Sequence, residues 1–249
     1  DMFLTNKKII AVILSHNCEH LITKTLERIP ENIFDEIIVS DDGSTDNSVK
    51  IYREMGYKVF ETSVGGYGSN SRNGVKSAFE SGADYAVEIH GDGAQFDPSA
   101  ITNAKKLMED GTDLILGSRF LVKGKARKLG MPLPRFLANI GLSFFDRIIL
   151  NKNLSEFHTG FRVYGKNIMN VYSERFSNDH ICSFQIIAAT IAKGLSIDEI
   201  EVDCDYRGEH TSHGYAGASL YAILHFGVLL QFVLHKYLKL SYGVFKNDR

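Results

Sequence analysis

Short apolar runs and helical patterns alternate along the first half of the chain. The apolar runs are typical of buried strands, and they predict strands at Ile9–Leu14, Glu36–Val39, Lys58–Glu61, Tyr85–Ile89 and Asp113–Leu116. The segments between them predict helices at His20–Arg28, Asn47–Met55, Ser69–Ser81 and Ser99–Glu109. Strands that alternate with helices favour the α/β class, with a mostly parallel sheet that helices cover.

A polar loop follows each predicted strand: SHNCE, SDDGSTD, TSVGGYGSN, HGDGAQFDP and GSRF. In an open parallel sheet, ligands bind beyond the carboxyl ends of the strands, where such loops cluster. The carboxylates of SDDGSTD and HGDGAQFDP are therefore expected to converge, although about fifty residues separate them.

The second half of the chain has a different pattern. Residues 119–135 hold six basic residues and no acidic one, with glycines and prolines that exclude a long helix. A helix is expected at Arg135–Leu150, and the polar loop EFHTGFRVYG then runs into a short strand. A helix near His180–Lys193 and an edge strand near Leu195–Val202 complete the expected sheet.

Residues 211–235 carry no formal charge when histidine is neutral, so this segment is long and apolar enough to span a membrane. On a helical wheel, however, polar residues gather on one side: His225, Gln231, His235, Lys236 and Lys239. Such a stripe favours an amphipathic helix lying in the membrane interface. The alternative is a helix that packs on the catalytic domain or on a dimer partner. We expect a catalytic domain at residues 1–210 and a C-terminal appendage at residues 211–249.

Composition limits the classes of function. The chain has 249 residues, enough for one large α/β domain, and its formal net charge of -2 gives no reason to expect a nucleic-acid partner. Cys18, Cys182 and Cys204 lie far apart, which suits a reducing cytosol and argues against disulfides or a zinc site. The apolar run after Lys7 and Lys8 is too short for a signal peptide and is expected to be the first strand.

The loops contain residues suited to a nucleotide and a metal ion. Carboxylates are costly to crowd at a strand end without partners, although a turn that caps the next helix would also explain SDDGSTD. Asp92 lies between two glycines after a buried strand, where its carboxylate could hold a divalent ion that bridges to phosphates. The alternative is a strand-to-helix turn in which Asp97 and Pro98 begin the next helix. An EF-hand is excluded because SDDGSTD lacks the terminal Glu and the carboxylate spacing.

Five motifs in order carry a family resemblance: IIAVILSHNCE, VSDDGSTDNS, HGDGAQFDP, LGSRF and EFHTGFRVY. Together they resemble family 2 glycosyltransferases of the GT-A fold. Within that family the chain is most similar to the bacterial branch related to dolichyl-phosphate mannose synthase and other polyprenyl-phosphate sugar transferases. The resemblance extends from Lys7 to about Leu238.

The resemblance implies a role for each motif. Asp41 matches the carboxylate that accepts from the nucleobase, Asp42 lies close to the ribose, and Asn17 and Glu19 match the loop that contacts the nucleoside. Asp92 matches the last Asp of the DxD-like metal motif for Mg²⁺ or Mn²⁺, and Gln95 would add a ligand oxygen.

The remaining implied roles concern phosphates and the acceptor. Arg119, Arg127 and Arg135 would face the donor diphosphate or an acceptor phosphate. His158, Thr159, Gly160 and Arg162 match the loop that closes on the acceptor side.

Three positions depart from the family pattern. His90 stands where many relatives have the first Asp of DxD, so it either ligates the metal or packs as a structural histidine. Ala94 lengthens the motif by one residue, which affects the assignment of Gln95. Asp205 occupies a position where many relatives have Arg, and Arg207 could supply that charge.

The resemblance implies a single displacement that moves a sugar from a nucleotide-diphosphate sugar with inversion at the anomeric carbon. A phosphate acceptor is already ionised, whereas a hydroxyl needs a general base. No carboxylate in the second half of the chain stands out as that base, although Glu156 and Asp179 are candidates. We therefore expect a polyprenyl-phosphate acceptor and a cytoplasmic enzyme on the inner face of the cytoplasmic membrane. The basic residues in 119–135 suit an acceptor phosphate or an anionic membrane surface, which supports this expectation. A solvated loop would show the same pattern of charges.

Two alternatives remain, and a third is disfavoured. One is a transferase that extends a polysaccharide on a hydroxyl acceptor, and another is an inactive module that binds nucleotide-sugars. A sugar-nucleotide nucleotidyltransferase should show a Gly-rich basic loop after the first strand, which SHNCEH is not.

Overall fold

The computed structural model describes residues 5–62, 65–206, 215–240 and 243–246. The described residues form a seven-stranded sheet in the order β3-β2-β1-β4-β6-β5-β7. The strands are β1 (Ile9–Ser15), β2 (Glu36–Asp41), β3 (Lys58–Glu61), β4 (Tyr85–His90), β5 (Leu114–Ser118), β6 (Arg162–Gly165) and β7 (Ile197–Glu201). Only β6 runs antiparallel to its neighbours, so the expectation of a mostly parallel sheet is confirmed.

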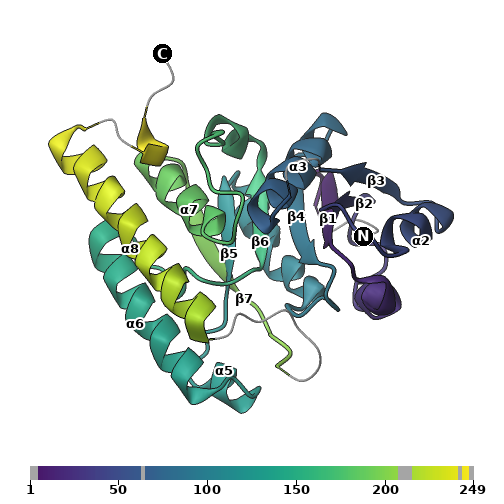
Figure 1. Cartoon of the computed structure of the whole chain (residues 1–249), viewed down its shortest axis with the longest axis horizontal. Coiled ribbons are helices and arrows are strands. Elements are labelled where there is room, and N and C mark those ends of the chain that lie inside the picture. The colour runs from purple at the N-terminus through teal and green to yellow at the C-terminus, as the bar shows by residue number, and fades with distance from the viewer. Residues whose placement is uncertain (1–4, 63–64, 207–214, 241–242, 247–249) are drawn as a thin grey trace.

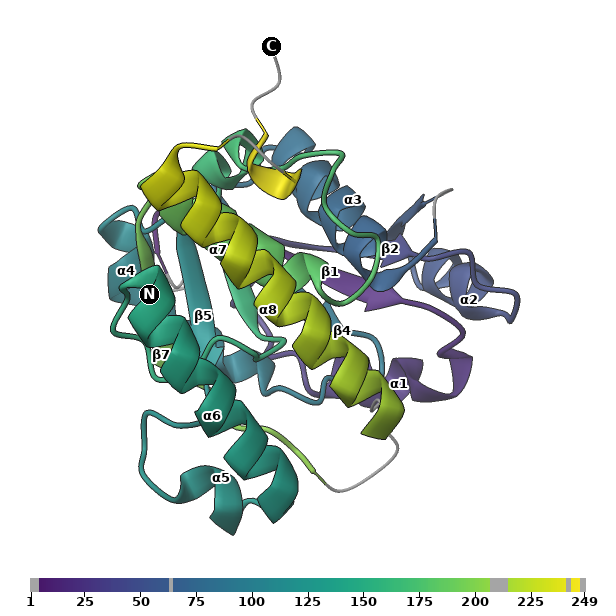
Figure 2. The same ribbon diagram turned by 60° about the vertical axis from the view of Figure 1, so that its left-hand side comes forward.

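Helices cover both faces of the sheet (Figures 1 and 2). The α-helices are α1 (Ile22–Glu27), α2 (Ser48–Glu54), α3 (Tyr67–Glu80), α4 (Lys105–Glu109), α5 (Lys125–Lys128), α6 (Leu133–Leu150), α7 (Cys182–Ala192) and α8 (Tyr215–Leu238). Short 3-10 helices are η1 (Glu19–Leu21), η2 (Pro98–Ala104), η3 (Lys166–Asn170) and η4 (Gly243–Phe245).

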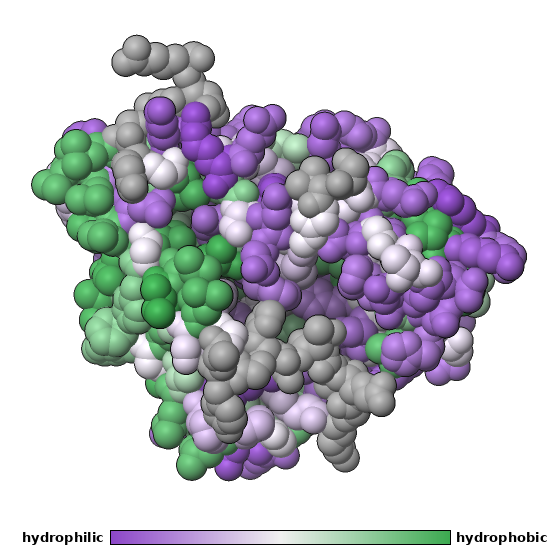
Figure 3. Space-filling view, in the orientation of Figure 1, coloured by the Kyte–Doolittle hydropathy of each residue, from purple (hydrophilic) through white to green (hydrophobic). Residues whose placement is uncertain are grey.

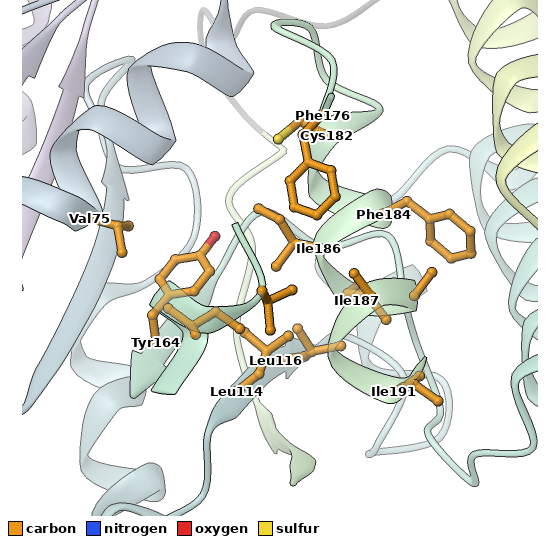
Figure 4. Packing of buried hydrophobic residues seen from close by; sticks show 14 of the residues in the cluster. Val75, Leu114, Leu116, Tyr164, Phe176, Cys182, Phe184, Ile186, Ile187 and Ile191 are labelled. Atoms are coloured by element: carbon orange, nitrogen blue, oxygen red, sulfur yellow. The ribbon is translucent and has the colours of Figure 1, made fainter. Parts of the chain in front are cut away.

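Alternation along the central strand divides the core into two layers. Ile10 and Val12 of β1 face the layer that contains α3, α7 and α8, whereas Ile9 and Ala11 face the layer with α1, α2 and α4. Successive side chains of a strand point to opposite faces, so a continuous apolar run supplies both layers. Figure 4 shows the first layer, where apolar side chains of α7 meet those of β5 and β6.

One expected helix differs from the structure. Residues 98–104 form the 3-10 helix η2, and only Lys105–Glu109 are α-helical. In a 3-10 helix, residues three apart lie one above the other. This geometry brings Ile101 and Ala104, both fully buried, over the sheet. Asp97 caps η2 by accepting from Ser99 N at 2.9 Å, as expected for the start of this helix.

α8 is part of the core. Val228, Leu229 and Phe232 are buried with residues of α7, and Phe245 of η4 joins them. The expected domain boundary at residue 210 lies outside the described residues. His225 of the predicted polar stripe is fully buried, while Ile223 and Leu230 on the same helix are exposed. The stripe is therefore divided, because His225 is buried and Gln231 accepts from Val244 N at 3.2 Å, whereas Lys239 is exposed. The outer side of α8 presents apolar residues to its surroundings.

Candidate nucleotide-sugar site

The polar loops gather at one edge of the sheet. Strands β1, β2, β4, β5 and β7 run parallel, so their carboxyl ends share this edge. β6 runs the other way and therefore begins there, with Arg162 paired in register with Glu88. The loop before β6 thus reaches the same edge as the loops after β1, β2 and β4. The loops after β2 and β4 lie two strand spacings apart, about 10 Å, with the loop after β1 between them.

The loops after β1 and β2 are tied together. Asn17 Oδ1 accepts from Thr45 N at 2.8 Å, and Glu19 Oε2 accepts from Asn47 N at 2.8 Å. Asn17 adopts a left-handed backbone, with φ 47°, which asparagine tolerates better than most residues. The side chains assigned to nucleoside contact therefore also hold the two loops in one arrangement.

Asp41 and Asp42 already have backbone partners. Asp41 is buried, and its two oxygens accept from Ser44 N at 2.8 Å and from Ser44 Oγ at 2.6 Å. Both oxygens of Asp42 accept from Gly66 N, at 2.9 and 2.8 Å, where α3 begins. The turn-capping explanation of SDDGSTD therefore describes the geometry of Asp41, and nucleobase contact would add to that role.

Asp92 has the features of a cation ligand. It follows β4, and its Oδ1 is buried without a hydrogen-bond partner among the described residues. Such an oxygen is costly unless something pairs with it. A Cβ on Gly91 would lie 2.6 Å from Leu14 O, so only glycine lets the motif pass this close to β1. One carboxylate with an open oxygen fits Mg²⁺ or Mn²⁺, which take one or two carboxylates plus substrate oxygens.

The extra residue of the motif is absorbed locally. Ala94 has a left-handed backbone, with φ 50°, and its N–H donates to His90 O at 3.1 Å. Gln95 is buried, and its backbone carbonyl oxygen accepts from Asp205 N at 2.9 Å. This bond and the bridge between Phe96 and Cys204 tie the motif to the segment after β7.

His90 has a carboxylate partner. Its Nε2 lies 3.3 Å from Oε1 of buried Glu88. Burial alone would lower the pKa of His90, but the hydrogen bond and charge of Glu88 outweigh it and raise this pKa. The Nε2 atom that faces Glu88 is occupied by this contact, so the geometry favours His90 as a hydrogen-bond partner of Glu88.

Glu88 is a functional candidate that the sequence analysis missed. It accepts from Tyr67 Oη, from Ser71 Oγ at 2.7 Å and from Tyr164 Oη at 3.0 Å, in addition to His90. Burial would raise the pKa of Glu88, but these donors and the charge of Arg162 hold it at about 2. Its signal in the sequence is a single carboxylate inside the apolar run YAVEIH.

Arg162 is a buried cation with spare donors. Its Nη2 donates to Thr159 O at 3.1 Å, whereas Nε and Nη1 are buried without partners among the described residues. Burial would lower the pKa of Arg162, but Tyr164, Tyr67 and Glu88 keep it above its ordinary value. A buried guanidinium with unpaired N–H groups suits an anionic ligand.

The loop before β6 lies directly against the Asp92 motif. A Cβ on Gly160 would lie 2.5 Å from His90 Cε1 and 2.7 Å from the Phe96 ring. His158 instead contacts the helices, with Nε2 2.8 Å from Asp146 Oδ2 and Nδ1 3.1 Å from Tyr221 Oη. The structure therefore brings Gly160 and Arg162 to the Asp92 motif and places His158 among α6 and α8.

The predicted phosphate-binding arginines have different environments. Arg119 is buried and forms a bidentate ion pair with Glu156, with Nε 2.9 Å from Oε1. In this ion pair the charges of Arg119 and Glu156 compensate each other. Arg127 is exposed and donates to Met131 O, and Arg135 lies over the ring of Tyr206, 5.8 Å from its centroid.

Comparisons with known proteins agree with this geometry. The model of Glycosyl transferase family 2 matches residues 10–172. A UDP-N-acetylglucosamine–dolichyl-phosphate N-acetylglucosaminyltransferase of Methanococcus voltae is 28% identical over 223 residues, which cover 82% of this chain and 88% of that protein.

Solved structures show the same fold. Glucosyl-3-phosphoglycerate synthase from Mycobacterium tuberculosis in complex with Mn²⁺, UDP and glucosyl-3-phosphoglycerate superposes with a TM-score of 0.63. It is 15% identical, and the match covers 91% of this chain and 80% of that chain. The same synthase with Mg²⁺ and UDP gives a TM-score of 0.61 at 16% identity, covering 91% and 79%. Because the family model matches more than half of the sequence, the chain belongs to glycosyl transferase family 2 and is a glycosyltransferase of the GT-A fold.

Proposed function

We propose that this protein is a metal-dependent inverting glycosyltransferase that moves a sugar from a nucleotide-diphosphate sugar to a polyprenyl phosphate. The observation that carries the proposal is that two groups at the edge where the loops meet, Asp92 Oδ1 and the Nε and Nη1 groups of Arg162, are buried without partners among the described residues. One group suits a cation and the other an anion, as a metal-assisted transfer between phosphates requires.

The donor side is supported by the first two loops. Asn17 and Glu19 hold the loops after β1 and β2 together, and Asp41 shapes the turn at Ser44. UDP is bound by the structural neighbour from Mycobacterium tuberculosis, and UDP-N-acetylglucosamine is named for the Methanococcus voltae relative. We infer a uridine nucleotide as the donor, with Asp41 and Asp42 toward the nucleoside.

The diphosphate side is supported by Asp92. A divalent cation held there supplies positive charge that stabilises the departing diphosphate. Asp92 is the ligand that the geometry favours, because His90 is bonded to Glu88 and Gln95 is buried in the turn. Arg162 adds a fixed positive charge that needs no reorganisation during the reaction.

The environments of the two candidate general bases favour a phosphate as the acceptor. Glu156 is paired with Arg119, and Asp179 is an exposed residue that accepts from its neighbour His180 N at 2.8 Å. Neither carboxylate is a buried, unpaired base suited to deprotonating a hydroxyl, and an ionised phosphate needs none. The relative from Methanococcus voltae is named for a dolichyl-phosphate acceptor.

A lipid acceptor agrees with the outer surface of α6 and α8. These helices lie side by side, and hydrophobic residues gather over them in the space-filling view (Figure 3). The exposed apolar residues on them are Leu133, Leu137, Ile140, Phe144, Phe145, Ile148, Leu220, Ile223, Leu224, Phe226, Leu230, Tyr237 and Leu238. Exposed apolar surface of this kind marks a site of interaction with a membrane or a protein.

The surface favours attachment in the membrane interface. The helical part Ser219–Leu238 is long and apolar enough to cross a bilayer, a property that core helices of soluble proteins share. Val228 and Phe232 are buried in the protein core, which a helix surrounded by lipid would not show. Exposed Arg127 and Lys128 on α5, next to the start of α6, suit anionic headgroups.

The test is transfer of sugar from UDP-sugars to dolichyl or undecaprenyl phosphate with Mn²⁺ or Mg²⁺. Asp92→Asn should lower turnover by about a hundredfold or more, because it removes charge stabilisation from the transition state. Asp97→Asn is the matched control, since Asp97 lies on the same loop but caps η2. Near-normal turnover in Asp92→Asn, or transfer to glycan hydroxyls alone, would contradict the proposal.

A further inference from the structure

A buried carboxylate joins two histidines, one on the loop before β6 and one on α8. Asp146 of α6 is fully buried, with Oδ2 2.8 Å from His158 Nε2 and Oδ1 2.6 Å from His225 Nε2. His225 belongs to α8 and is fully buried as well. One side chain therefore connects α6, α8 and the loop before β6.

The hydrogen bonds fix where the protons lie. An ionised carboxylate only accepts, so both imidazoles donate Nε2–H to Asp146. Burial would raise the pKa of Asp146, but hydrogen bonds from the two histidines hold it below its usual range. Burial lowers the pKa of His158, so this ring is neutral and its Nδ1 is an acceptor. Tyr221 Oη, 3.1 Å away, is the donor to that nitrogen.

The distances indicate hydrogen bonds and not metal ligation. A tetrahedral zinc ion with bonds of about 2.0 Å keeps its ligand atoms about 3.3 Å apart. The two Nε2–oxygen separations, 2.6 and 2.8 Å, are shorter, and each imidazole bonds a different oxygen of Asp146. His225 Nδ1 is buried without a partner among the described residues. A metal ion bound to His225 Nε2 would require the ring proton to lie on Nδ1. Burying that N–H without an acceptor costs more free energy than burying an unprotonated nitrogen.

The network ends at the proposed site. His158 is two residues from Gly160, which touches His90, and Arg162 follows at the start of β6. Tyr221 and His225 lie one turn apart on α8. The hydrogen bonds of Tyr221 to His158 and of His225 to Asp146 therefore both depend on the position of this helix. A shift of α8 would therefore be transmitted to the loop that faces the Asp92 motif.

We propose that Asp146 is a positioning residue that fixes the tautomer of His158 and thereby holds the loop 158–162 against the Asp92 motif. Through Tyr221 and His225, the position of this loop depends on the docking of α8. The expected effect on kcat rests on the proposed function. The tautomer of His158, in contrast, is a property of the folded protein alone.

Asp146→Asn tests the tautomer directly. An amide offers one acceptor and one NH₂ donor, so one imidazole must give up its Nε2–H. We expect His158 to change, because its new Nδ1–H can donate to Tyr221 Oη, whereas the part of the chain that the structure describes offers His225 Nδ1 no such partner. Long-range ¹H–¹⁵N NMR of the histidine rings measures this change, and Ser143→Ala on the same helix is the control. An unchanged His158 tautomer in Asp146→Asn would overturn the proposal.

Kinetics provide the second test. Asp146→Asn should lower kcat by about ten- to a hundredfold, because a small misplacement of the loop that faces the Asp92 motif is this costly, while calorimetric affinity for UDP with Mn²⁺ stays unchanged. Tyr221→Phe should keep the His158 tautomer and lower kcat less. Equal loss of kcat and UDP binding would show a general folding defect and overturn the proposal. Stoichiometric zinc in the purified wild-type protein, lost in Asp146→Asn, would show a metal site instead. If no transfer activity is found, the proposed function fails, but the NMR result still decides the role of Asp146.

Discussion

Asp41 and Asp42 are neighbours in the chain, but they hold different loops. Asp41 binds the turn at Ser44, and Asp42 binds the start of α3 through Gly66 N. The hydrogen bonds of this turn explain why Asp41 is buried. If Asp41 also contacts the nucleobase, it has a second role in ligand binding. Substitution separates these roles because Ser44 can be changed without removing the carboxylate.

We predict that Asp41→Ala weakens UDP binding by about 1–3 kcal/mol, the cost of a lost charge-assisted hydrogen bond. Ser44→Ala, which removes only the 2.6 Å side-chain bond to Asp41, should have a smaller effect. Titration calorimetry with UDP and Mn²⁺ measures both. Equal losses in the two variants would show that Asp41 serves only the turn.

Glu88 should make stability depend on acid pH. Its pKa is held at about 2 in the folded protein, below the ordinary value of 4.5. Its charge therefore contributes stability above pH 4.5, and this contribution is lost as pH falls from 4.5 toward 2. Urea unfolding of wild type and Glu88→Gln should show an advantage of the wild type at pH 7 that shrinks across this window. An advantage that stays constant down to pH 2 would contradict the assignment, and Glu80→Gln, on the exposed side of α3, is the control.

At the scale of elements, the sequence predicted the sheet well because continuous apolar runs mark strands β1, β2 and β5. The loops after the strands were also placed at the correct edge, since parallel order fixes that edge. The side chains within the loops were harder to place. His158 follows the family motif yet turns toward Asp146, a residue that the sequence shows only as one carboxylate in an apolar helix. No local pattern links residues 146, 158 and 225.

Gly160 offers a test of how the loop before β6 meets the Asp92 motif. Gly160→Ala would put a methyl group 2.5 Å from His90 Cε1 and 2.7 Å from Phe96, so the loop must move away. We predict a loss of transfer activity of about tenfold or more, since small displacements of reacting groups are costly, with UDP affinity retained. Gly141→Ala on α6, where a Cβ meets nothing within 4 Å, is the control and should be neutral or slightly stabilising. Full activity of Gly160→Ala would show that this contact is not needed.

At the scale of the whole molecule, the proposed site and the apolar surface are connected. The loop before β6 touches the Asp92 motif on one side and bonds α6 and α8 on the other, through Asp146 and Tyr221. The outer surfaces of these two helices are apolar, whereas the side formed by β1–β3 and α2 is mostly hydrophilic (Figure 3). This asymmetry would let the phosphate of a lipid reach the site while its chain stays in a membrane.

We predict that the protein binds vesicles that contain anionic lipid, through the outer surfaces of α6 and α8. Deleting α8 would remove core residues such as Phe232, so surface variants are the sharper test. Ile148 and Ile223 are 61% and 69% exposed on the two helices, so Ile148→Glu with Ile223→Glu should abolish sedimentation with vesicles and leave UDP affinity unchanged.

Met55→Glu is the matched control, because Met55 is 52% exposed at the end of α2 on the hydrophilic side. Bound wild-type protein should be released by alkaline carbonate, as peripheral proteins are, because burial of Val228, Leu229 and Phe232 ties α8 to the protein core. Wild-type protein that stays in the supernatant at low salt, or a double variant that still sediments, would assign this apolar surface to a protein partner instead.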